Sequence, residues 1–291
     1  MVAREVIVIE NARLTPGPGF RPMNAFFYYL MRLIPYAGPR RCVAALLAML
    51  VGRGPRQTGS HADVADGVRQ RQLRRYGWVT LPDVFSARQI AQMGEFLRGR
   101  SVASAAGWMD PERPPPTTRR ASYPLADVMD CPHVLATINA PRLLDLAGQY
   151  LGCRPTISSI GIHWSFPGHG AVVDMPRFHR DPDDWRFLKL FCYLTDVDES
   201  SGPHLYVEGS HRTSGRIRAR TYFDDDVANR YGAESVVRIV GLRGTSPRSS
   251  PTPTDCTRGV HRCRDRGSRS RCATPSCRYS SSTTGRSLSR G

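Results

Sequence analysis

A histidine and an aspartate two residues apart are the side chains in this sequence best placed for chemistry. They are His179 and Asp181, in Phe178-His179-Arg180-Asp181 at the head of a β-rich segment. Residues two apart share one face of a strand, so an imidazole and a carboxylate there can aim at one point. Such a pair forms two thirds of the facial triad that holds non-haem Fe(II). A second histidine is expected downstream as the third ligand.

Two further polar residues could serve the same site. His163 lies beside Trp164 on a predicted strand, where it could contact a substrate or cosubstrate, or belong to a packed aromatic pair. Lys189 lies in an apolar run, and a buried lysine needs a partner. It could bind a cosubstrate carboxylate, or point outward from an edge strand.

The elements that must position these residues change in kind along the chain. Apolar periodicity predicts helices at 68–75, 87–97, 134–138 and 141–151, the second of them capped by Ser86. Strands are predicted at 76–82, 156–164, 187–194, 205–207 and 235–240, and residues 101–120 are a predicted loop. Helices followed by a run of strands favour an α+β fold with a barrel or sandwich as its core.

The N-terminal region, residues 1–60, is predicted to be a helical extension and linker. A short strand is expected at 6–9, and two helices within 22–52, broken by Pro35 and by Gly38-Pro39. Flanking arginines leave an interfacial membrane role open for these helices. The alternative, which the usual burial of an amphipathic face favours, is a helical pair packed on its own domain or on a partner.

Charge is distributed very unevenly along the 291 residues. Residues 246–291 hold ten Arg and two acidic residues, a net of +8 and half of the +16 of the whole chain. The remainder is only moderately basic, so the total charge does not predict a specific nucleic-acid partner. From Ser246 onward there is no Ile, Phe, Met or Trp. Because such a segment cannot bury enough apolar surface to order itself, we expect residues 246–291 to be a disordered basic tail.

Cysteine use and the N-terminus predict a cytoplasmic protein. The cysteines before the tail are scattered without paired spacing, as expected for reduced, buried thiols: Cys42, Cys131, Cys153 and Cys192. The first residues lack a basic region followed by an apolar run, so no secretory signal is expected. The most apolar stretch, 43–51, is far shorter than the ~20 residues of a spanning helix, so no transmembrane segment is expected.

An ordered set of motifs resembles the phytanoyl-CoA dioxygenase family of Fe(II)/2-oxoglutarate oxygenases, over about residues 65–245. The motifs are the opening Tyr76-Gly77-Trp78-Val79-Thr80-Leu81-Pro82, the helix start Phe85-Ser86, His179-x-Asp181, Tyr193-Leu194-Thr195-Asp196-Val197-Asp198, and Gly202-Pro203 through Val207-x-Gly209-Ser210-His211. The resemblance implies a double-stranded β-helix, a jelly-roll or cupin-like barrel with flanking helices, within a domain at 61–245. The barrel would be incomplete at the C-terminus.

The resemblance also implies a chemistry. Fe(II) would be held by His179, Asp181 and the distal histidine, with 2-oxoglutarate as cosubstrate and ascorbate as reductant. An arginine after the distal histidine would pair with the far carboxylate of 2-oxoglutarate. Related halogenases have a small residue at the position of Asp181, so a carboxylate there implies hydroxylation. The substrate would be a small or lipid-like molecule.

The chain departs from the family after Gly241-Leu242-Arg243-Gly244-Thr245. Family members continue into a strand with an Asp-Thr-x-x-x-His-x-Gly motif, but here Ser246-Pro247-Arg248 follows. Synonymous codons exist for Pro251 to Gly259 that, read two bases later, encode Asp-Thr-Tyr-Gly-Leu-His-Lys-Gly. The hypothesis is a frameshift near Thr245 that removes the distal histidine and the 2-oxoglutarate arginine. His261, the sole histidine of the tail, could replace the ligand only if the tail folded back.

Two functions therefore remain open from the sequence. The first is an Fe(II)/2-oxoglutarate-dependent dioxygenase that is impaired in this chain. The alternative is a non-catalytic binding protein that keeps the barrel and uses its basic tail for anionic partners.

Overall fold

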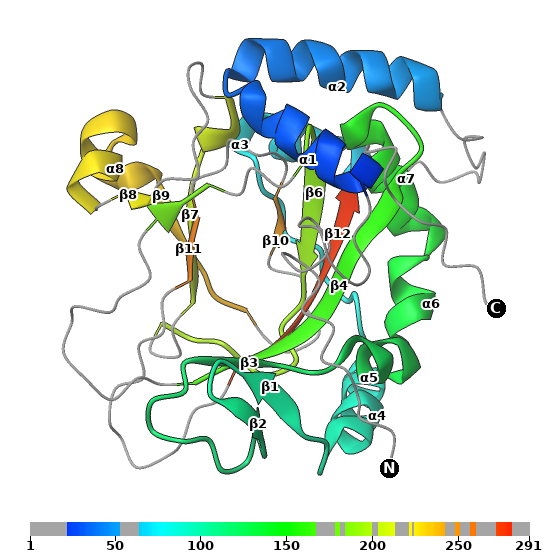
Figure 1. The fold of residues 1–291 in the computed structure, drawn as a ribbon, viewed down its shortest axis with the longest axis vertical. Coiled ribbons are helices and arrows are strands. Elements are labelled where there is room, and N and C mark those ends of the chain that lie inside the picture. The colour runs from blue at the N-terminus through cyan, green and yellow to red at the C-terminus, as the bar shows by residue number, and fades with distance from the viewer. Residues whose placement is uncertain are drawn as a thin grey trace.

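Two antiparallel sheets form the opposite walls of a barrel, with helices packed outside (Figure 1). The computed structural model describes residues 22–52, 64–166, 178–180, 184–199, 203–212, 221–222, 224–241, 248–250, 257–259 and 272–280. The predicted strand at 6–9, most of the predicted linker and Asp181 lie outside these residues.

The larger sheet has seven strands in the order β10-β6-β12-β4-β3-β1-β2. Its strands are β1 (Val102–Ser104), β2 (Gly107–Met109), β3 (Arg120–Ser122), β4 (Thr156–Ser165), β6 (Phe187–Phe191), β10 (Arg248–Ser250) and β12 (Cys272–Ser280). The hairpin β1–β2 lies inside the region predicted to be a loop. β1 contributes the buried Val102, but Gly107 and Trp108 of β2 are exposed, so the sequence lacks the strong alternation that marks a half-buried strand.

The smaller sheet has five strands in the order β8-β5-β11-β7-β9. They are β5 (Phe178–His179), β7 (His204–Val207), β8 (Thr221–Tyr222), β9 (Val236–Ile239) and β11 (Thr257–Gly259). Two short 3₁₀ turns, Ser210–Arg212 and Ala233–Ser235, and the helix α8 (Asp224–Tyr231) lie around this sheet. Asp224 to Asp226 form the first turn of α8, where carboxylates favour the positive end of the helix dipole.

Three strands come from the region expected to be a disordered tail. β12 is inserted between β4 and β6, β11 lies between β5 and β7, and β10 pairs with the other side of β6. These segments differ from the expectation of disorder because pairing through backbone N–H and C=O groups requires few apolar side chains. The rest of residues 246–291 lies outside the described part of the chain.

The helices α3 to α7 cover the outer face of the seven-stranded sheet (Figure 1). They are α3 (Val64–Tyr76), α4 (Ala87–Leu97), α5 (Leu125–Asp130), α6 (Val134–Ile138) and α7 (Pro141–Leu151). Ser86 caps α4 with a full capping box to Gln89, as predicted. Leu188 and Leu190 of β6 pack against residues of α3 and α7, so one face of β6 looks toward the helices.

Two N-terminal helices, α1 (Pro22–Leu33) and α2 (Ala37–Val51), lie side by side at one end of the molecule (Figure 1). The break falls at Pro35, as predicted. Gly38 and Pro39 do not break the chain again, because they stand in the first turn of α2, where a missing N–H costs no helical hydrogen bond. Met31 and Ala44 pack with Trp185, which joins the pair to the barrel.

Of residues 76–82, predicted as a strand, Tyr76 ends α3, and the following residues form a connection outside the named strands with a single bridge residue at Leu81. The cause lies at Gly77, which has φ +86°, a left-handed conformation that favours glycine. A Cβ at this position would meet the Tyr206 hydroxyl at 2.0 Å and His211 Nδ1 at 2.4 Å. Tyr76 accepts a hydrogen bond from the Gly209 N–H. The opening motif at 76–82 and the Gly-Ser-His motif at 209–211 therefore pack against each other.

This contact predicts a large effect of a methyl group at position 77. Gly77→Ala should lower the free energy of unfolding by about 2–4 kcal/mol, because it adds overpacking to a strained φ. Urea denaturation measures it. The matched control is Gly94→Ala in α4, where a Cβ meets no atom within 4 Å and helix propensity should stabilise by up to about 1 kcal/mol. Equal effects of the two variants would contradict the packing described.

Candidate metal centre

The first residue of the predicted pair, His179, faces the inside of the barrel. Its neighbour Phe178 is buried with Leu205 and Val227 on the outer side, toward α8. Arg180, which is also buried, donates to the Tyr231 hydroxyl and lies over the Tyr222 ring on that outer side. Successive residues of a strand point to opposite faces, so His179 points inward between them. Asp181 lies outside the described residues.

The inner face of the five-stranded sheet also carries His204 and Tyr206. The alternate residues of β7, Leu205 and Val207, belong to the outer cluster with Phe178. The His204 ring lies 5.4 Å from the ring of Phe191 on β6. This contact joins the two sheets across the barrel interior, so the inner faces of β6 and β7 line the same space.

Lys189 lies on the inner face of the seven-stranded sheet. Leu188 and Leu190 point to the helices, so Lys189 points the other way, and its Nζ lies 5.4 Å from the centre of the Phe187 ring. β6 is flanked by β10 and β12. The alternative that Lys189 points outward from an edge strand is therefore wrong, because β6 is an internal strand.

His163 shares the inner side of the same sheet. Ile162 packs in the helix-side cluster, so the alternation of β4 turns His163 inward. Its Nδ1 lies 2.7 Å from the Ser122 hydroxyl. Burial, together with the nearby Arg120, lowers the pKa of His163 to about 3, so the imidazole is neutral at physiological pH. Trp164 stacks instead on Phe166 at 6.3 Å, so the aromatic pair of this strand does not include His163.

The tail strand β11 brings position 257 beside His179. Thr257 is paired in register with His179 on β5 and with Tyr206 on β7. Directly opposed residues of antiparallel strands lie on the same face, about 4.5–5.5 Å apart at Cβ. Position 257 therefore shares the inner face with His179. Arg258 is paired with Leu205, so position 258 belongs to the outer face.

Among the described residues, no group of three or more His, Cys, Asp or Glu side chains could hold a metal ion. His211 has a structural setting, since its Nε2 lies 3.0 Å from the Arg74 carbonyl oxygen and burial lowers its pKa to about 4. His261 lies outside the described residues. The inward-facing polar residues described above, His163, Lys189, His179 and His204, come from four different strands, and their histidines form no such group.

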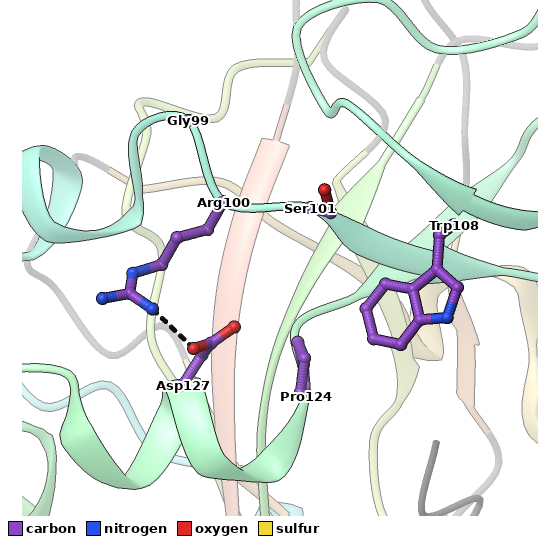
Figure 2. A pocket seen from close by; sticks show the side chains of 6 residues that line it. All are labelled: Gly99, Arg100, Ser101, Trp108, Pro124 and Asp127. Carbon is purple, nitrogen blue, oxygen red and sulfur yellow. Dashed lines mark hydrogen bonds and ion pairs between the residues drawn. The ribbon is translucent and has the colours of Figure 1, made fainter. Parts of the chain in front are cut away.

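A separate cavity of about 450 Å³ lies on the outside of the barrel, between α5 and the strands β1 and β2 (Figure 2). Figure 2 shows Arg100 and Asp127 pointing toward one another, with Trp108 across the hollow. Arg100 pairs with Asp127 at 2.6 Å and lies 3.9 Å from the Phe96 ring centre, so its charge is balanced by the fold. His163, His179 and Lys189 do not line this cavity.

Sequence reasoning missed one residue that holds the chain just after the His-x-Asp motif. Arg40 of α2 is 3% exposed and donates to the Asp184 carbonyl oxygen at 2.7 Å and to the Met31 carbonyl oxygen at 2.7 Å. Its guanidinium lies 5.3 Å from the Trp185 ring centre. Burial lowers the pKa of Arg40 to about 10, which leaves it charged at neutral pH. The signal in the sequence was the helical spacing of Ala37, Arg40 and Ala44, the buried face of α2.

Two facing antiparallel sheets with helices outside define a double-stranded β-helix barrel, and His179 on β5 lies on an inner face of it. Residues 73–246 match the model of phytanoyl-CoA dioxygenase (PhyH). Because the match covers more than half of the chain, the chain belongs to that family. The α+β fold and the family predicted from the sequence are confirmed.

Solved structures of low sequence identity share this fold. AviO1 from Streptomyces viridochromogenes Tue57 has a TM-score of 0.52 and 16% identity, over 76% of this chain and 97% of its own. EctD from S. alaskensis, with 2-oxoglutarate and 5-hydroxyectoine, has a TM-score of 0.51 and 17% identity, over 79% of each chain. The epimerase SnoN, in complex with Fe3+, alpha ketoglutarate and nogalamycin RO, has a TM-score of 0.51 and 18% identity, over 74% of this chain and 83% of its own. No curated protein matches the sequence.

The Arg40 contacts predict that the N-terminal helices stabilise the barrel. Arg40→Ala should lower the free energy of unfolding by about 2–4 kcal/mol, because it leaves two buried carbonyl groups without their donor. Urea denaturation followed by tryptophan fluorescence measures it. The control is Arg41→Ala on the exposed face of the same helix, expected within about 0.5 kcal/mol of the parent. A neutral Arg40→Ala would show that α2 is not held by this residue.

Proposed function

We propose that this barrel is the scaffold of an Fe(II)/2-oxoglutarate-dependent dioxygenase, a hydroxylase of a small or lipid-like molecule, and that the chain is impaired at its metal site. The observation that carries the proposal is the register of β11. His179 faces the barrel interior, and the position opposed to it on the neighbouring strand is occupied by Thr257. His179 and Asp181 are the proposed protein ligands, and position 257 is the proposed place of the third.

With Thr257 at the third position, the proposed ligands do not fit a three-ligand iron site, and the described residues include no group of three that would. A neutral threonine hydroxyl is a much weaker ligand than imidazole or carboxylate for a metal of this kind. With two strong ligands instead of three, the chain is expected to hold Fe(II) weakly. We therefore derive no reaction step for this chain and propose that it is inactive or nearly so.

Two inward-facing residues are proposed to serve the cosubstrate. The ammonium group of Lys189 can pair with a carboxylate of 2-oxoglutarate, as a point charge on the inner face of β6. His163, neutral and held through Ser122, can offer one ring nitrogen to a polar group of the cosubstrate or substrate. Ascorbate as reductant and a cytoplasmic location remain predictions from the sequence.

The alternative reading frame agrees with the register. In the codon set that yields Asp-Thr-Tyr-Gly-Leu-His-Lys-Gly, the His codon takes the last base of the Cys256 codon and the first two bases of the Thr257 codon. The shifted frame thus puts a histidine at the position opposed to His179. The two arguments are distinct, since one uses codons and the other uses strand pairing. Together they support a frameshift as the cause of the lost ligand.

The register predicts a gain of metal binding from one substitution. Thr257→His should tighten binding of Fe(II), or of Co(II) as a spectroscopic substitute, by at least about tenfold, since changes in outer-shell partners alone alter affinity by ~10–100-fold. Calorimetry under anaerobic conditions and the visible spectrum of the Co(II) complex measure it. The matched control is Arg258→His, which adds the same side chain to the outer face. Equal gains in both variants, or none in Thr257→His, would refute the assignment of position 257.

The proposed activity is tested by iron- and ascorbate-dependent conversion of 2-oxoglutarate to succinate. The comparison is between this chain and a version in which the frame is restored after Thr245. We expect turnover only in the restored version. Turnover in the unaltered chain would contradict the proposed impairment. Resequencing the locus gives a separate check, and an alternative frame without the His motif would exclude the frameshift.

The second candidate is a binding protein without catalysis. It is favoured by the lack of a three-residue metal group among the described residues and by the net +8 of residues 246–291. This function predicts no succinate formation in either version of the chain. It also predicts salt-sensitive binding of polyanions that is lost when the tail arginines are replaced.

A further inference from the structure

The N-terminal helices present an apolar surface on the side away from the barrel. On α2, the exposed residues recur at helical spacing and form one stripe: Arg41, Cys42, Ala45, Leu46, Met49 and Leu50. Met49 is 78% exposed and Leu50 is 73% exposed. On α1, Phe26, Tyr29 and Leu33 are exposed at the same kind of spacing. We name these residues of α1 and α2 together the helical face.

The helix α2 is already packed on its own domain, so its exposed apolar residues are not left over from incomplete docking. The opposite side of α2 is already packed, through Ala44 and through the buried Arg40. The C-terminal end of α2 is held as well, because the Gly52 carbonyl oxygen accepts a hydrogen bond from the Arg154 N–H. The helix is therefore fixed at both ends with an apolar stripe turned outward.

The positive charge of residues 22–52 favours an anionic partner. Residues 22–52 contain no Asp or Glu, and their exposed charges are Arg32 and Arg41. A second copy of the chain would bring like charges together without any acidic residue of this region to pair with them. A bilayer with anionic lipids offers apolar depth for Leu46, Met49 and Leu50, and phosphate groups for the arginines, whose stems extend along the apolar layer. Aromatic side chains such as Tyr29 favour the boundary between the two.

We infer that the helical face binds the surface of an anionic lipid bilayer. The protein would lie on the membrane and not cross it, since no helix in the described part of the chain is long and apolar enough to span one. The inference is independent of the proposed function, because it uses none of the residues of the metal centre.

Vesicle sedimentation of the full chain tests this inference. The vesicles are phosphatidylcholine alone and phosphatidylcholine with phosphatidylglycerol. The parent chain should bind the anionic vesicles, and the binding should weaken as salt is raised. The triple variant Leu46→Ser, Met49→Ser, Leu50→Ser should bind at least about tenfold more weakly, because it removes most of the apolar area of the α2 stripe. Met49→Glu provides a single change that puts a charge at the same place.

The basic tail would also attract anionic vesicles, so the comparison is made between variants that share it. The control is Val240→Ser, an exposed apolar residue outside the helical face, which should bind as the parent does. Thermal unfolding midpoints equal to the parent's verify that the exposed substitutions leave the fold intact. If the triple serine variant and Met49→Glu both bind anionic vesicles as well as the parent does, the binding belongs to the tail and the inference is overturned. Dimers of the parent chain that are absent from the triple variant would show that the helical face mediates self-association, and this result would also overturn the inference.

Discussion

Backbone pairing between β11 and its two neighbours, β5 and β7, is the constraint on which the proposed metal centre depends. A strand of three residues fixes which side chain stands beside His179, because register in an antiparallel sheet also fixes the face. A shift by one residue would put position 258 on the inner face in place of 257. The hydrogen-bonding pattern therefore defines which position lies beside His179, the proposed place of the third ligand, independently of the side chain that occupies it.

The fold can keep this geometry because backbone and side chain make separate contributions. The apolar clusters among the described side chains lie on α3 to α7, β4, β6 and β7. The backbones of the later strands pair with edges that the earlier strands leave open. The barrel fold can therefore form around strands whose sequence departs from the family pattern after residue 245.

The features of this protein that depend on local sequence patterns could be predicted from the sequence. The helices with clear apolar periodicity, the cap at Ser86 and the inward alternation at His179 follow from spacing that is visible within a few residues. The strand predicted at 76–82 is absent around Gly77, which has a positive φ and whose backbone lies too close to Tyr206 and His211, both distant in the sequence, to admit a Cβ. Arg40 was missed for a related reason, since its partners Asp184 and Trp185 lie far along the chain. Periodicity could not place position 257, because only its pairing with β5 and β7 determines which residues lie beside it.

The insertion of β12 between β4 and β6 has a consequence for how the protein is made. The strand with the most extensive pairing in the larger sheet is the last of the described strands in chain order. Until it arrives, β4 and β6 each present an open edge of unpaired N–H and C=O groups, and such edges recruit strands from other chains. Assembly of the larger sheet therefore has to wait for residues 272–280, and a nascent chain that stops short of them would be exposed to aggregation.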